Sequence, residues 1–150
     1  RVYRPNDSMT RQEFVVSLIR FLHVDTAQYA ATQLPFADSD KIASWALDSV
    51  RAAYAMGLMT VSGRDGQLYA NPASTITRQE AMAIIGRTQP KGYQEADLSA
   101  FTDSAAVASW AQSYIASMVS RGIIAGNNGK LDPTGQVTRA QVAKMLYMLS

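Results

Sequence analysis

The stretch FADSDKIASWA at residues 36–46 recurs as FTDSAAVASWA at residues 101–111, each residue shifted by 65 positions. Further on, ITRQE at 76–80 recurs as VTRAQ at 137–141 with a shift of 61, so the second copy has lost four residues in the loop between the motifs. Repeated units vary in length mainly in their loops. The chain is therefore built on an internal repeat, and the prediction of its fold begins there.

The N-terminus holds only the back half of this repeat, because the segment MTRQE at 9–13 follows no Phe-x-Asp and Trp segment. We expect the back half of a first repeat at 1–23, a connector at 24–35, a second repeat at 36–88, a connector at 89–100 and a third repeat at 101–150. Within a full copy, the Trp-containing helix is expected to pack against the Thr-Arg helix that follows it. The first Thr-Arg helix would then lack a partner of its own copy.

Each full copy has the pattern of a helix, a loop and a second helix. After Trp110, apolar residues recur at helical spacing as far as Val119, and Gly122 suits the left-handed position that follows a helix. The loops GRDG at 63–66 and GNNG at 126–129 consist of turn-forming residues. No strand is required, although residues 67–69 could pair briefly. The predicted fold class is all-α.

The three Thr-Arg segments fit the capping-box pattern, in which a threonine and a Glu or Gln three residues later satisfy each other's backbone N–H groups. The pairs are Thr10 with Glu13, Thr77 with Glu80, and Thr138 with Gln141. Capping does not explain the arginine between them, because a cation in the first turn opposes the helix dipole. We therefore predict that Arg11, Arg78 and Arg139 contact an anionic ligand together with free backbone N–H groups, with salt bridges as the alternative.

Three further pairs of repeated residues are candidates for the same binding site. They are Trp45 and Trp110, Asp38 and Asp103, and Gly63 and Gly126. A tryptophan face can stack on a sugar, with core packing as the alternative. The aspartates precede helix starts, where capping or turn hydrogen bonds are the alternative. The glycines suit turn geometry, which also brings N–H groups close to an anion.

Composition excludes several classes of function. Hydrophobic residues make up 47% of the chain, enough for a core, and a net charge of +2 is too weak for a dedicated nucleic-acid binder. With no cysteine and His23 as the single histidine, the sequence predicts no metal site, no cofactor and no catalytic triad. An EF-hand calcium loop fails at Ile124, which would have to be its first ligand. No apolar run is long enough for insertion into a membrane.

Taken in order, these motifs resemble the S-layer homology modules of bacterial surface proteins, and the resemblance covers nearly the whole chain. It implies a pseudo-threefold, three-pronged helical bundle whose grooves bind an anionic secondary cell-wall polysaccharide, commonly with pyruvylated N-acetylmannosamine. The expected parent protein is secreted and held at the cell wall or S-layer surface, and the module itself is not an enzyme. Two departures are Gln141 in place of Glu and the missing front half of the first repeat, which the rest of the parent protein would supply. A protein–protein scaffold of the envelope is the alternative and would need an exposed apolar patch.

Overall fold

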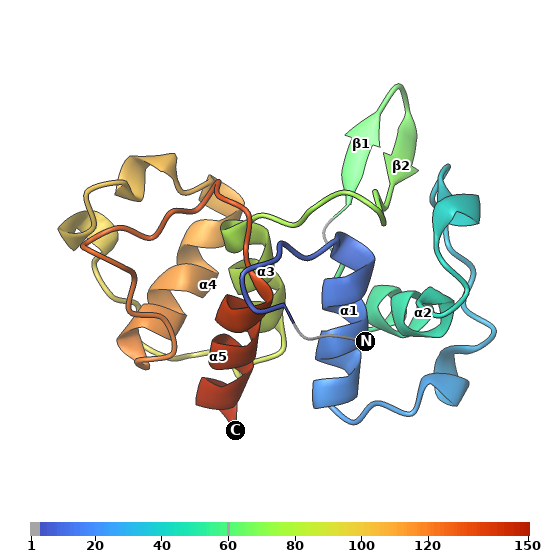
Figure 1. Cartoon of the computed structure of the whole chain (residues 1–150), viewed down its shortest axis with the longest axis horizontal. Helices are drawn as coiled ribbons and strands as arrows, with labels where there is room; N and C mark the ends of the chain where they lie inside the picture. The colour runs from blue at the N-terminus through green and yellow to red at the C-terminus, as the bar shows by residue number, and fades with distance from the viewer. Residues whose placement is uncertain (1–3, 60) are drawn as a thin grey trace. The chain divides into compact units, whose positions relative to one another are not determined.

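The computed structural model describes residues 4–59 and 61–150. Its α-helices in this part of the chain are α1 (Arg11–Phe21), α2 (Leu47–Ala55), α3 (Arg78–Arg87), α4 (Ser109–Ser120) and α5 (Arg139–Leu149). Short 3-10 helices lie at Thr26–Tyr29, Ser39–Lys41, Leu98–Ala100 and Ser104–Ala106. An antiparallel hairpin, β1 (Ser62–Arg64) and β2 (Gln67–Tyr69), is the one sheet assigned among these residues (Figure 1). The predicted helical fold is confirmed, and the hairpin includes the segment expected to pair briefly.

The chain divides into two compact units that cut across the repeats. One unit is Met9–Thr75, and the other is Ile76–Ser150 with the described N-terminal residues up to Ser8. In each unit, the helix that contains or closely follows the repeated Trp packs against the Thr-Arg helix of the preceding copy: α2 against α1, and α4 against α3 (Figure 1). In the second unit, which contains both helices, the expectation that α4 would pack against α5 of its own copy is wrong, because α4 packs against α3. Among the described residues of that unit, α5 is therefore the Thr-Arg helix without an extensively packed Trp-containing helix.

In the unit Met9–Thr75, helix α1 has more buried residues than α2. Its buried apolar residues are Phe14, Val15, Val16, Leu18 and Ile19, and α2 adds Val50, Ala52 and Ala53. The register of the pair is marked by Gln12, whose side-chain oxygen accepts a hydrogen bond from the Ala43 N–H at 3.0 Å. Gly57 ends α2 with a φ of +75°, as a glycine after a helix commonly does.

In the second unit, α3 and α4 repeat this arrangement. Gln79 of α3 accepts from the Ala108 N–H at 2.9 Å, the same contact one copy later, and Gly122 ends α4 with a φ of +75°. Helix α5 differs, because Val142 and Met145 are its only residues assigned to the core. The three-pronged arrangement implied by the resemblance stays a prediction. No helix in the described part of the chain combines the length and apolarity that crossing a membrane requires.

Candidate functional site

All three capping boxes are present as predicted. The Thr77 hydroxyl accepts from the Glu80 N–H at 3.3 Å, and the Glu80 carboxylate accepts from the Thr77 N–H at 3.0 Å. The same exchange joins Thr10 to Glu13 and Thr138 to Gln141. An amide oxygen serves as well as a carboxylate here, which is why the Gln in the last copy changes nothing in the cap.

The first two N–H groups of each Thr-Arg helix are bound by the backbone of a proline-containing loop. In the second unit Arg78 donates to Gly135 O at 2.8 Å and Gln79 to Pro133 O at 2.8 Å, while Arg139 donates to Asp7 O at 3.0 Å and Ala140 to Pro5 O at 2.9 Å. In the other unit Arg11 donates to Ser74 O at 2.8 Å and Gln12 to Pro72 O at 3.0 Å. The threonine cap occupies the third N–H group. The expectation that these N–H groups are free for an anion is therefore wrong, and anion recognition has to come from side chains.

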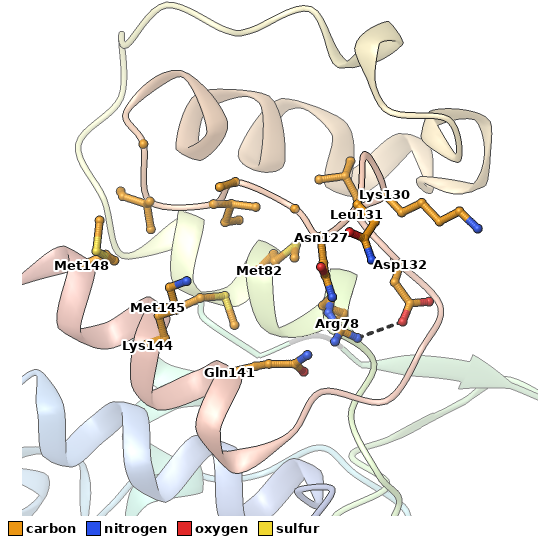
Figure 2. Close-up of a pocket in the computed structure, with 16 residues that line it drawn as sticks. Arg78, Met82, Asn127, Lys130, Leu131, Asp132, Gln141, Lys144, Met145 and Met148 are labelled. Atoms are coloured by element: carbon orange, nitrogen blue, oxygen red, sulfur yellow. Dashed lines mark hydrogen bonds and ion pairs between the residues drawn. The ribbon is translucent and has the colours of Figure 1, made fainter. Parts of the chain in front are cut away.

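Arg78 lies at one end of a cavity of about 850 Å³ in the second unit (Figure 2). Its Nη1 donates to Asp132 Oδ2 at 3.2 Å and to Gln136 O at 3.4 Å. The side chain of Arg78 is 14% exposed and that of Asp132 is 63% exposed, so the carboxylate is the outer member of the pair. Ion pairing was the alternative for this arginine, and the structure contains it.

The cavity is lined by both charged and apolar residues. Its basic residues are Arg78, Lys130 and Lys144, and Asp132 is its one carboxylate in the described chain. Apolar side chains of α3, α5 and the loop between α4 and α5 line the rest: Met82, Ile123, Ile124, Leu131, Met145 and Met148. Asn127 and Gln141 add neutral donors and acceptors (Figure 2). This lining suits a ligand with an anionic group, hydroxyl or amide groups and an apolar face.

Gly126 lines this cavity and has a physical reason to be glycine. Its φ is +76°, and a Cβ there would lie 2.7 Å from Phe101 Cε1 and 2.8 Å from Lys130 O. In the other unit Gly63 lies opposite Leu68 in the hairpin, where a Cβ would meet nothing within 4 Å and the φ is not positive. The turn geometry expected of Gly63 is wrong for this position, because the left-handed residues there are Asp65 and Gly66.

The two repeated aspartates tie their copies together across long stretches of chain. Asp38 accepts from Ala70 N–H at 2.9 Å and Asn71 N–H at 2.8 Å. Asp103 accepts from Leu131 N–H at 2.9 Å and Asp132 N–H at 2.8 Å. Each precedes a 3-10 helix, yet neither side chain caps it, so the capping alternative is wrong. The Leu131 hydrogen bond is the main cause that lowers the pKa of Asp103.

The structure brings only some of the predicted site residues together. Arg78 and Gly126 line one cavity, and Asp103 holds the loop that contributes Leu131 and Asp132 to it. Arg139 starts α5 in the same unit but does not line this cavity. The residues Arg11, Trp45, Asp38 and Gly63 belong to the other unit.

The two tryptophans are on the surface instead of in the core. Trp45 is 58% exposed, in a turn before α2, and Trp110 is 44% exposed, in the first turn of α4. Neither helix has a side-chain cap at its start. The core-packing alternative is therefore wrong for both rings, which leaves their faces accessible to a ligand.

Sequence reasoning missed most of the cavity lining. Lys130, Asp132 and Lys144 carry its charge besides Arg78, and the repeat pattern points to none of them. One signal was available for Asp132, because it occupies the position before the loop proline in its copy. The equivalent residues are Arg4 and Asn71, so the charge at this position changes from copy to copy. No group of three potential metal-ligating side chains occurs among the described residues.

Comparison with known proteins finds a family model that matches two segments of the chain and relatives that match nearly all of it. A family model described as S-layer homology domain matches residues 35–82 and 100–143. An amylopullulanase from Thermoanaerobacterium thermosulfurigenes is 32% identical over 98% of this chain, which corresponds to 8% of that protein. An exoglucanase, XynX, from Acetivibrio thermocellus is 29% identical over 98% of the chain and 13% of its own length. An endoglucanase from Bacillus sp. (strain KSM-635) is 30% identical, with 98% and 15% covered. The chain thus spans a small part of each of these relatives.

Proposed function

Because this chain belongs to the S-layer homology domain family, we propose that it holds its parent protein to an anionic secondary polysaccharide of the bacterial cell wall. Domains of this family are non-catalytic modules that attach secreted proteins to the cell surface. The finer proposal concerns the ligand: a polysaccharide with an acidic group, of which a pyruvylated amino sugar is the form we favour. The module binds this polysaccharide without forming a covalent bond.

The observation that carries this proposal is the charge of the cavity beside α3. Arg78, Lys130 and Lys144 line the cavity together with a single carboxylate of the described chain, Asp132, so the lining has an excess of positive charge. A guanidinium and an ammonium bind carboxylates through charge-assisted hydrogen bonds. A pyruvate ketal offers a carboxylate and a methyl group on one carbon, which match the basic residues and the methionines that line the cavity.

The first prediction tests this ligand on purified wall sacculi. We expect the protein to sediment with native sacculi, and to stay in solution after the secondary polymer is extracted. Arg78→Gln and Lys144→Gln should each weaken binding by roughly tenfold, the loss of one charge-assisted contact. Lys91→Gln is the matched control, because it removes an exposed lysine that does not line the cavity.

Two results would refute parts of the proposal separately. Equal sedimentation with extracted sacculi would exclude the secondary polymer as the ligand. Equal affinity for native and depyruvylated polymer would exclude recognition of the ketal carboxylate while leaving the polymer as ligand.

A second partner is proposed from the exposed face of α5. Tyr147 is 75% exposed and Met148 45% exposed on α5, the Thr-Arg helix of the second unit that has no extensively packed Trp-containing helix among the described residues of that unit. We infer that the front half of the first repeat, supplied by a longer parent chain, packs on this face as α2 packs on α1. The parent protein would then be a secreted chain in which this module is the anchor.

A further inference from the structure

The residue before the loop proline differs in charge between the copies, although the loops hold their helices in the same way. Asp132 precedes Pro133 and Asn71 precedes Pro72, and both have a left-handed backbone with φ of 49° and 50°. The loop of Pro133 accepts the first two N–H groups of α3, and the loop of Pro72 accepts those of α1. Asp132 therefore occupies the same backbone position relative to Arg78 as Asn71 does relative to Arg11.

The side chains of these two residues point to different partners, and the next loop residues explain why. Asp132 reaches Arg78 Nη1 at 3.2 Å by lying over Gly135, where a Cβ would be 2.5 Å from Asp132 Oδ2. The residue equivalent to Gly135 in the other copy is Ser74, which has a side chain in that position. There, Asn71 Nδ2 donates to Ser62 Oγ at 3.4 Å. The contact between Asp132 and Arg78 thus depends on both the charge at 132 and the glycine at 135.

We propose that Asp132 is a specificity-determining residue that lowers the affinity of this cavity for anions by engaging Arg78, an inference that rests on the proposed function. Arg78 is the less exposed member of the pair, and its guanidinium is held from outside by a carboxylate that is 63% exposed. An acidic group entering the cavity has to take Arg78 from Asp132 or bind beside its negative charge. Only a ligand whose acidic group makes additional contacts with Lys130, Lys144 or Asn127 competes well.

The proposal predicts opposite effects from removing the carboxylate and removing the guanidinium. Asp132→Asn should tighten binding of an acidic ligand by about tenfold, because it removes a like charge a few ångströms from the ligand and releases Arg78. The variant is isosteric, and Asn71 shows that this loop accepts an asparagine with the same backbone conformation. Gly135→Ser should tighten binding in the same direction without changing any charge, since the added Cβ displaces the carboxylate from its position over residue 135. Ser74 is the precedent for a serine there.

The test uses two probes, measured by calorimetric titration on the whole chain. One is N-acetylmannosamine carrying a pyruvate ketal, and the other is the same sugar without the ketal. We expect Asp132→Asn and Gly135→Ser to bind the acidic sugar more tightly than the unmodified protein, and to change binding of the neutral sugar by much less. Asp40→Asn is the control, because it removes an exposed carboxylate that does not line the cavity.

A readout without any sugar separates this proposal from the proposed function. In a titration with inorganic phosphate followed by the NMR signal of the Arg78 Nε–H group, Asp132→Asn should respond at about tenfold lower phosphate than the unmodified protein. If that holds while no protein binds either sugar, the ligand proposal fails and the role of Asp132 stands. If Asp132→Asn binds the acidic sugar equally or more weakly than the unmodified protein, Asp132 is not an opposing charge and the inference is overturned.

Discussion

At the scale of single residues, the aspartate of each Phe-x-Asp motif acts far from its place in the sequence. Asp103 accepts two backbone N–H groups from the segment that begins at Leu131, and Asp38 does the same at Ala70. The N–H groups of a loop have few hydrogen-bond acceptors available besides water. A carboxylate has two acceptor oxygens, so it can bind two of these N–H groups and hold the loop against its helix. The motif is therefore a tether between the two halves of a copy.

The tether predicts a pH dependence of stability. The pKa of Asp103 is lowered from its ordinary value of 3.8, so the folded protein binds this proton less readily than the unfolded chain. Its contribution is present above that value and is lost as pH falls through the lower folded pKa. We expect Asp103→Asn to reduce the free energy of unfolding by about 1 kcal/mol at neutral pH, since an amide retains one acceptor oxygen.

The measurement is urea unfolding of the unmodified protein and Asp103→Asn over a series of pH values from neutral to about 3. The difference in the free energy of unfolding between the two proteins should shrink toward low pH, because protonation of Asp103 removes the same acceptor from the unmodified protein. Asp40→Asn serves as the control for loss of surface charge. A difference that is constant with pH would contradict the role given to the Asp103 charge.

At the scale of elements, the two helix pairs differ in which helix carries the large residue and which carries the small one at an equivalent position. Gly86 of α3 lies where a Cβ would be 2.7 Å from the Cβ of Tyr114 in α4. The equivalent residues of α1 and α2 are Ile19 and Ser49, both buried. At these equivalent positions the larger residue is on α4 in one pair and on α1 in the other. Close-packed interiors require this kind of compensation in volume.

This exchange predicts a strong coupling between the two positions. Gly86→Ile should lower the free energy of unfolding by about 3 kcal/mol, because the new side chain meets Tyr114 in a filled interface. Adding Tyr114→Ser to that variant should recover at least about 1 kcal/mol relative to the sum of the two single changes. Chemical denaturation of all four proteins gives the coupling energy. Additive losses would mean that the two residues do not share one packing site.

At the scale of the whole molecule, α5 buries fewer of its residues than the other Thr-Arg helices of the described chain. Helix α3 buries five consecutive residues from Ala81 to Ile85, whereas α5 buries Val142 and Met145. Its exposed Tyr147 and Met148 are large apolar surface that a partner helix would cover. By the repeat pattern that places α2 on α1 and α4 on α3, the proposed further front half would pack on α5.

A longer version of the protein tests this. Extension at the N-terminus with the parent sequence that supplies the Phe-x-Asp and Trp segment should slow hydrogen exchange of the α5 amides, while an extension of scrambled sequence should not. Tyr147→Ser should leave the present chain nearly as stable as before and should destabilise the extended one by about 1–3 kcal/mol. Unchanged exchange in α5 would show that the added segment packs elsewhere.

What the sequence by itself determined is short in range. The capping boxes, the left-handed Gly122 and the helical spacing after Trp110 all depend on residues within a few positions of one another, so local geometry decides them. The repeat also identified Arg78 and Gly126 as candidate binding residues, and both line the cavity. Residue types that recur at fixed spacing can be recognised without a structure.

Only the tertiary structure decided which half-repeats pair, and what the polar groups of the Thr-Arg motif do. The helix-start N–H groups that looked free donate to loop carbonyls, Asp103 binds a loop instead of a helix start, and Arg78 is engaged by Asp132. Each of these contacts joins segments that are far apart along the chain. A local pattern shows that a donor or a charge is present, but its partner is set by the packing of whole elements, which determines what the loops bring within hydrogen-bonding distance.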